Sequence, residues 1–112
     1  MENFEKTVVA DVAVETVNLS RATLEHASTF KSMINEDISN GIRKMVIDLR
    51  NCEFMDSTFI GVLVVSLKNL KKLNGKLHLV KPHSFAHSVL ESINTLRIFD
   101  IYDSLEEATN SF

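Results

Sequence analysis

The chain has 112 residues, of which 45% are hydrophobic, and its formal net charge at pH 7 is −3. This length fits one domain, residues 1–112, with a single core, and the negative charge argues against a protein that binds nucleic acid by neutralising phosphates. One cysteine, no leader with a charged start and an apolar run, and no apolar run near the roughly 18 residues of a membrane span favour a protein of the reducing cytoplasm that does not enter a membrane.

The first half of the chain predicts two strands, a helix and a third strand. Residues 5–19 are rich in Val and Thr without a helical stripe, so we expect two short strands joined near Ala10 and Asp11, paired antiparallel at one edge of a sheet. A helix is expected from Ala27 to Asn40 and Gly41, with apolar side chains at three- and four-residue steps. Residues 44–49 contain a continuous apolar run, which is typical of a strand covered on both faces.

The second half continues the alternation of helices and strands. A helix is expected over residues 57–73, a strand over 77–80, a helix over 83–94 and a short extended piece over 98–102. Ser104, followed three residues later by Glu107, is typical of a capping box that starts a final helix. The order ββαβαβαβα predicts an α/β fold, a mixed sheet of about 4–5 strands with about 4 helices packed on it.

The candidate functional residue is Ser57, in the run Asp56-Ser57-Thr58 that opens the second long helix. Unpaired backbone N–H groups and the helix dipole favour negative charge at such a position, so a phosphate on Ser57 would be tolerated there. Thr58 is a second, less favoured hydroxyl in the same turn. Asp56 is either the N-cap of this helix or part of phosphotransfer chemistry, and we favour the cap. Asp48 is expected to support the following loop by accepting its hydrogen bonds.

Residues 59–65 are apolar around the whole helix apart from Gly61, so one sheet face cannot bury every side chain. The pattern leaves Phe59, Val62 and Val65 on the outer side of the helix. Either a neighbouring helix covers them or they form an exposed apolar patch, and we favour a patch that binds a partner.

Other candidate chemistries have weak support in the sequence. His83 and His87 are four residues apart, but no third ligand is evident, so we expect surface histidines and no metal site. Cys52 is expected to be buried and unreactive. Ser57 lacks the G-x-S-x-G context of a hydrolase nucleophile, and glycine-rich phosphate loops are absent from the sequence. We therefore expect a protein that is not an enzyme.

Residues 47–64, IDLRNCEFMDSTFIGVLV, resemble the signature of the STAS domain of bacterial anti-sigma factor antagonists. In that family a hydrophobic strand ends in Asp, and an Asp-Ser-Ser/Thr-Gly-Leu/Ile-Gly run then opens a helix; here the matching positions are Asp48, Asp56, Ser57, Thr58, Ile60 and Gly61. The tail at residues 97–108, RIFDIYDSLEEA, is also typical of the family. Two positions depart from it: Phe59 occupies the place of the first Gly, and Thr23 replaces an acidic residue that often lies near the partner surface.

The resemblance implies a regulatory protein. Its unphosphorylated form would bind an anti-sigma factor that is also a serine protein kinase, and so release a sigma factor. Phosphorylation of Ser57 would block this binding, and a metal-dependent, PP2C-type serine phosphatase would reverse the block. ATP and magnesium would belong to the kinase, so this chain, a monomer or a weak dimer, would need no cofactor. The alternative is a STAS subunit that docks in another assembly, such as an ABC-type lipid transport complex or a stressosome-like particle.

Overall fold

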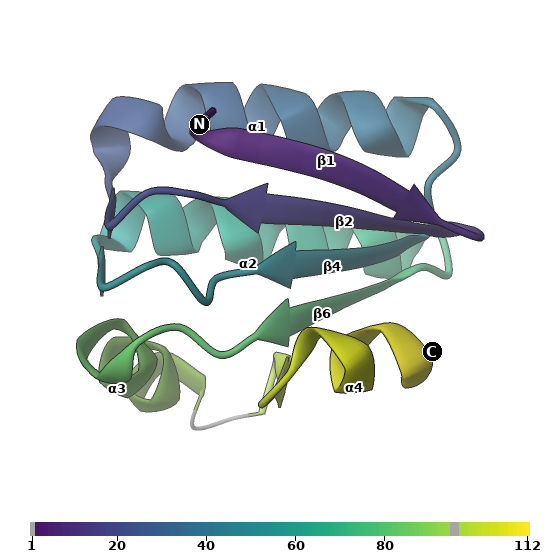
Figure 1. Ribbon diagram of the computed structural model, residues 1–112. Helices are drawn as coiled ribbons and strands as arrows, with labels where there is room; N and C mark the ends of the chain where they lie inside the picture. The colour runs from purple at the N-terminus through teal and green to yellow at the C-terminus, as the bar shows by residue number, and fades with distance from the viewer. Residues whose placement is uncertain (1, 95–96) are drawn as a thin grey trace.

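The computed structural model of the chain describes residues 2–94 and 97–112 (Figure 1). The elements in these residues are, in chain order, β1 (Phe4–Val9), β2 (Val12–Val17), β3 (Arg21–Ala22), α1 (Leu24–Ser39), β4 (Lys44–Asp48), β5 (Phe54–Met55), α2 (Ser57–Lys72), β6 (Lys76–Val80), α3 (Ser84–Ile93), β7 (Asp100–Tyr102) and α4 (Leu105–Asn110). Helices and strands alternate through most of the chain, as the sequence predicts.

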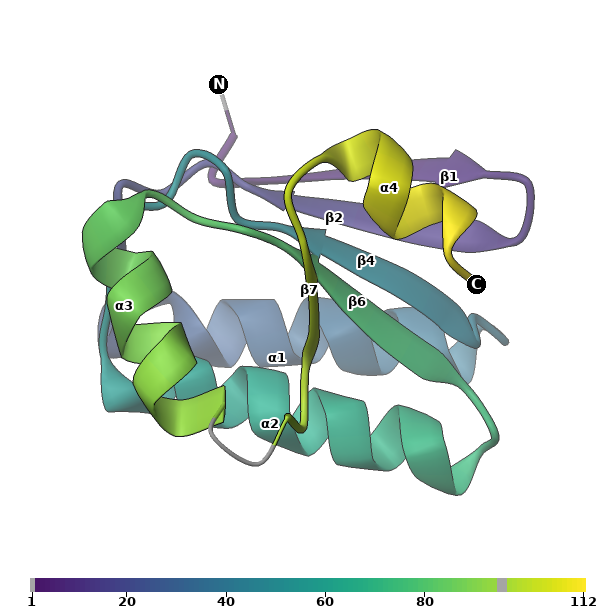
Figure 2. The same ribbon diagram turned by 90° about the horizontal axis from the view of Figure 1, so that it is seen from below.

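The main sheet has five strands in the order β1-β2-β4-β6-β7. β1 and β2 form an antiparallel hairpin, whereas the pairs β2–β4, β4–β6 and β6–β7 are parallel. Helices α1 and α2 lie on one face of this sheet and α4 lies on the other (Figure 2). The predicted α/β class, with a mixed sheet, an antiparallel pair at one edge and four helices, is confirmed.

The two sheet faces bury two apolar clusters of unequal size. On the larger side, Met45, Ile47 and Leu49 pack in one cluster with α1 and α2, and the alternate residue Val46 belongs to the smaller cluster beside α4. All residues of 45–49 are buried, because β4 lies in the middle of the sheet and is covered on both faces. The continuous apolar run in the sequence therefore has the predicted cause.

Three phenylalanines connect the edge strand to both long helices. Phe30 of α1 stacks on Phe4 of β1 with ring centroids 5.2 Å apart, and on Phe59 of α2 at 4.6 Å. Stacked aromatic pairs at such distances stabilise beyond the burial of their area. The stack fixes how α1 and α2 lie against each other.

A second, two-stranded parallel sheet was not predicted. Its strands β3 and β5 contain two residues each, and the registered pairs are Arg21 with Phe54 and Ala22 with Met55. Two residues are too few to show a period in the sequence. This small sheet joins the loop after β2 to the loop after β4 and holds the starts of α1 and α2 side by side.

The helix ends follow the predicted turn chemistry closely. Helix α1 begins at Leu24, three residues before the expected start, and ends before Gly41, which has the left-handed φ of 95° typical of a C-terminal glycine. After α2 the left-handed residue is Asn74, with φ of 61°. Gly75 is needed for space instead, because a Cβ there would lie 2.5 Å from the carbonyl oxygen of Arg43.

The C-terminal helix is fixed to the sheet by a buried histidine. His78 of β6 forms a 2.9 Å hydrogen bond through Nδ1 with the carbonyl oxygen of Ala108, and its ring stacks on Phe112 at 3.9 Å. At the other end of α4, the Ser104 hydroxyl accepts a hydrogen bond from the Glu107 amide, which is the N-cap half of the predicted capping box. Across residues 2–94 and 97–112, the helices are all too short or too polar to span a membrane.

Candidate functional site

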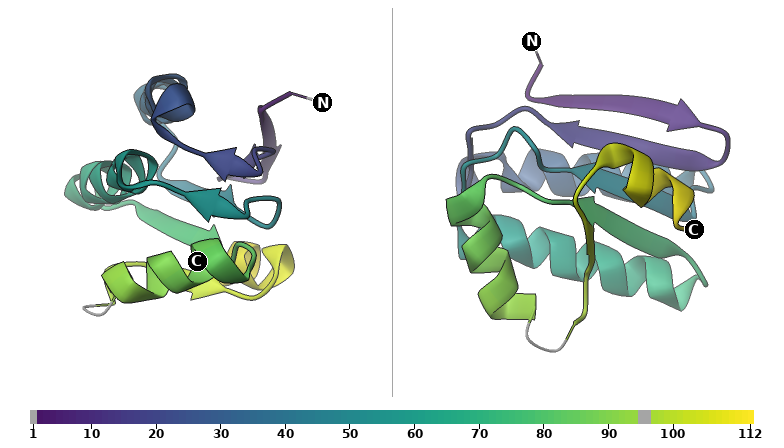
Figure 3. Two further views of the ribbon diagram at one scale, coloured as in Figure 1. Left: turned by 90° about the vertical axis from the view of Figure 1, so that its left-hand side faces the viewer. Right: turned by 60° about the horizontal axis from the view of Figure 1, so that its bottom comes forward.

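Ser57 and Thr58 are exposed at the first turn of α2. The loops and helix starts that surround them lie at one end of the molecule, where the parallel strands β2, β4 and β6 end (Figures 1 and 3). The predicted hydroxyl is therefore accessible to another protein.

Asp56 holds the starts of two helices with one carboxylate. Oδ1 accepts the amide of Phe59 at 2.9 Å, which is the predicted N-cap of α2, and Oδ2 accepts the amide of Leu24 at 2.8 Å, at the start of α1. Thr23, the N-cap residue of α1, makes no side-chain cap of its own. Asp56 thus takes over the capping of α1 from a distant part of the chain.

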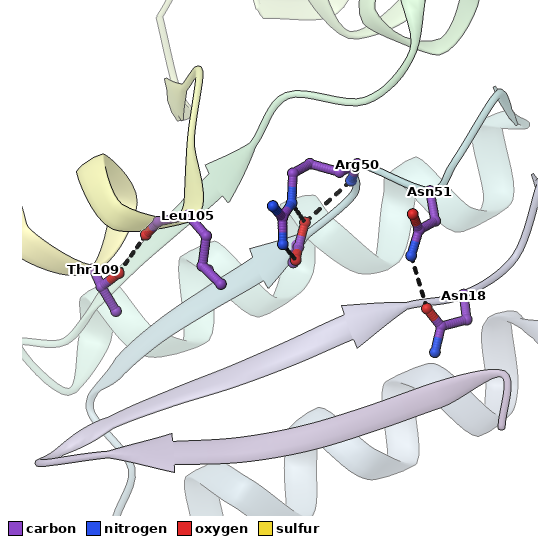
Figure 4. A network of polar contacts seen from close by, with 6 residues as sticks. Asn18, Arg50, Asn51, Leu105 and Thr109 are labelled. Atoms are coloured by element: carbon purple, nitrogen blue, oxygen red, sulfur yellow. Dashed lines mark hydrogen bonds and ion pairs between the residues drawn. The ribbon is translucent and has the colours of Figure 1, made fainter. Parts of the chain in front are cut away.

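Asp48 supports the loop between β4 and β5, as expected. Its carboxylate is almost fully buried and accepts three bonds from Arg50: from the backbone amide at 3.1 Å, from Nε at 2.9 Å and from Nη2 at 2.7 Å. The next residue, Asn51, donates to the side chain of Asn18 at 2.9 Å, which joins this loop to the end of β2 (Figure 4). The hydrogen-bonded Asp48 carboxylate raises the pKa of Arg50.

The expectation that Phe59, Val62 and Val65 form an exposed patch is wrong for two of the three residues. Phe59 is 0% exposed in the stack with Phe30, and Val62 is also buried. The physical reason is that α2 packs against both the sheet and α1, so a wide arc of the helix is covered. Only Val65, 44% exposed, lies on the outer side as predicted.

The exposed apolar side chains near Ser57 come instead from α1 and α3, and no pattern in the sequence indicates their exposure. Leu24 is 69% exposed at the start of α1, and Phe85, in the first turn of α3, is 58% exposed. Phe85 stacks on Phe54 at 5.6 Å, and the guanidinium of Arg21 lies 4.3 Å from the centroid of the Phe54 ring. We call Leu24, Phe54, Ser57, Thr58 and Phe85 the α2-start surface.

The remaining candidate residues have structural positions. His83 is the N-cap residue of α3, and His87 pairs with Glu91 at 3.0 Å. Within the described ranges no group of three possible metal ligands is found. Cys52 is buried, and burial raises the pKa of its thiol, which favours the unreactive protonated form as predicted.

Comparisons with known proteins agree with this architecture. A model of the STAS domain family matches residues 21–108. A Thermotoga neapolitana protein, named as a candidate anti-sigma factor antagonist, is 33% identical over 106 residues, which cover 94% of this chain and 93% of that protein. The crystal structure of a candidate anti-sigma factor antagonist from Thermotoga maritima has a TM-score of 0.86 at 30% identity, with coverage of 96% of this chain and 92% of that chain. The phosphorylated form of the Bacillus protein SpoIIAA has the same fold, with a TM-score of 0.75 at 17% identity and coverage of 96% of this chain and 97% of that chain.

Proposed function

Because this chain belongs to the STAS domain family, we propose that it is an anti-sigma factor antagonist in which phosphorylation of Ser57 switches partner binding off. The unphosphorylated form binds a serine kinase that is also the anti-sigma factor, and a sigma factor is released. A PP2C-type phosphatase restores the binding form. The single observation that supports this proposal best is the exposed hydroxyl of Ser57 at the start of a helix that the Asp56 carboxylate caps.

The position of Ser57 suits a switch that leaves the fold intact. A phosphate adds roughly 1.5 to 2 negative charges, and at the first turn of a helix the dipole stabilises negative charge by about 0.3–1 kcal/mol. The capping carboxylate of Asp56 already uses the amides of Phe59 and Leu24, so the added charge changes the outer surface more than the core. The scaffold is therefore expected to survive phosphorylation.

The same charge acts strongly on a docked partner. Leu24 and Phe85 offer exposed apolar area on the two elements beside α2, and we propose that the anti-sigma factor covers them together with Ser57, Thr58 and Thr23. A phosphate within that contact would have to lose water or face like charge, which costs several kcal/mol across an interface. At 1.4 kcal/mol per factor of ten, binding is lost. Val65, further along α2, would lie at the margin of the contact.

Ser57 variants test the switch. Ser57→Ala and Ser57→Asp are both expected to stay folded, and only the Asp variant should lose binding to the kinase in a titration with purified proteins. Incubation with kinase and ATP, followed by mass spectrometry, should place the phosphate on Ser57 and leave Ser57→Ala unmodified. Thr58→Ala is the matched control and should still be phosphorylated. Equal binding by the Ala and Asp variants would exclude the switch.

Surface variants test the docking site separately from the switch. Leu24→Ala and Phe85→Ala should each weaken kinase binding by about tenfold or more, which corresponds to about 1.4 kcal/mol. Val8→Ala is a suitable control, because Val8 is similarly exposed but lies on the β1–β2 hairpin. If the kinase does not phosphorylate Ser57, but Leu24→Ala and Phe85→Ala prevent this protein from joining a larger complex, the protein is better explained as a docking subunit of another assembly.

A further inference from the structure

Two carboxylates and one ammonium group meet between the edge hairpin and the C-terminal end of α1. Glu15 lies on β2 opposite Lys6 of β1 in the strand register, and Asp37 is in the last turn of α1. Glu15 is 1% exposed and Asp37 is 2% exposed. Lys6 Nζ lies 2.6 Å from Asp37 Oδ1, while the Lys6 side chain remains partly exposed.

If both acids are ionised, this cluster has more negative charges than positive charges and more acceptor oxygens than donors. Both oxygens of Glu15 and Oδ2 of Asp37 are buried and make no hydrogen bond to any described group. One ammonium would face two buried negative charges, and Asp37 also lies at the negative end of the α1 dipole. Buried, unpaired charge is costly, and a group in such a place takes up a proton instead.

We propose that Glu15 and Asp37 share one proton in the folded protein, so that the pair is a buried proton-binding site joining β1, β2 and α1. With the proton on Glu15, its hydroxyl donates to the free Oδ2 of Asp37, while Oδ1 of Asp37 accepts from Lys6. The net charge of the cluster is then zero. Each of the three elements contributes one group to this arrangement.

The charges around Glu15 support the same protonation state. Burial, followed by hydrogen bonding and repulsion from Asp37, raises the pKa of Glu15 from 4.5 to about 8. Glu36 adds repulsion, and Lys6 alone acts in the opposite direction. On the other side of β2, the registered residue of β4 is the apolar Ile47, which offers no charge.

The site makes the stability of the folded state depend on pH between the ordinary and the raised pKa of Glu15. Between pH 4.5 and about 8 the folded protein holds a proton on Glu15 that the unfolded chain has released. Stability therefore falls as pH rises through this window, by up to tenfold in the folding equilibrium constant per pH unit, and the loss is complete above pH 8. We expect β1, which is an edge strand of the main sheet, and the end of α1 to loosen first, because they carry Lys6 and Asp37.

The titration of Glu15 can be followed in the unmodified full chain by carboxyl carbon NMR. We expect a midpoint near pH 8, and a midpoint below pH 6 would overturn the proposal.

Urea unfolding at pH 5 and pH 8.5 gives an independent test. In the unmodified protein the equilibrium constant for unfolding should rise from pH 5 to pH 8.5. In Glu15→Gln this rise should be smaller by a factor of at least about a hundred. Glu25→Gln, a change of an exposed acid at the opposite end of α1, should keep the pH dependence of the unmodified protein. Identical pH profiles of Glu15→Gln and the unmodified protein would refute proton sharing.

Discussion

Asp56 provides a test of whether one carboxylate stabilises two helices. Asp56→Ala removes the acceptors of the Phe59 and Leu24 amides, whereas Asp56→Asn keeps one carbonyl oxygen and places an NH₂ group against the other amide. The two substitutions therefore remove two bonds and one bond respectively. The difference in their free energies of unfolding gives the contribution of the second bond.

The magnitude follows from the two bond lengths of 2.9 and 2.8 Å and from the charge on the acceptor. A hydrogen bond to a charged group contributes about 1.5–3 kcal/mol, and loss of an N-cap typically costs about 1 kcal/mol. Since Asp56 is half-buried, we use the lower part of these ranges. Asp56→Ala is expected to cost about 3 kcal/mol and Asp56→Asn about 1.5 kcal/mol.

Urea unfolding measures both losses, and amide hydrogen exchange identifies which bond is broken. In Asp56→Ala the amides of Leu24 and Phe59 should both exchange faster, and in Asp56→Asn only one of them should. Asp103→Asn is the control, because Asp103 forms an exposed ion pair with Lys81 that contributes about 0.5 kcal/mol or less. If Asp56→Ala is as stable as the unmodified protein, or if the exchange of Leu24 is unchanged, the carboxylate does not join the two helices.

Three further predictions concern packing. Phe59→Ala should lower the free energy of unfolding by about 3–5 kcal/mol, because it removes a fully buried ring. A double-mutant cycle with Phe30→Ala should give a coupling energy of about 0.5–1.5 kcal/mol. A loss of stability below about 1 kcal/mol in Phe59→Ala would show that the ring is not in the core. Gly61→Ala should raise the melting temperature, since a Cβ at Gly61 meets nothing within 4 Å and Ala is favoured over Gly in helices by about 1 kcal/mol. Gly75→Ala should lower it, because its Cβ would lie 2.5 Å from the carbonyl oxygen of Arg43, and a stabilised Gly75→Ala would contradict the close approach.

The elements that could be predicted are those whose signals are local. The apolar run of β4, the three- and four-residue steps of α1, and Asp56 as the cap of α2 each depend on residues close together in the chain. Their boundaries differ from the structure by a few residues at most, except where β3 and β5 add two short strands. The position of Ser57 followed from the same local pattern.

The features that could not be predicted depend on contacts between distant segments. Residues 59–65 are apolar on all sides, so the sequence does not say which side faces α1, and Phe59 was placed on the wrong side. Glu15 and Asp37 are 22 positions apart in the sequence, and nothing near either residue indicates that they meet. The exposure of Leu24 and Phe85 likewise follows only from how α1 and α3 lie beside α2.

The anchoring of α4 has a practical consequence for binding measurements. The C-terminal residue lies at the end of the molecule away from the starts of α1 and α2 (Figures 1 and 2), and Phe112 is held there by His78. A biotin or a fluorescent label attached through a linker after residue 112 would orient the protein on a sensor chip with the α2-start surface facing the solution.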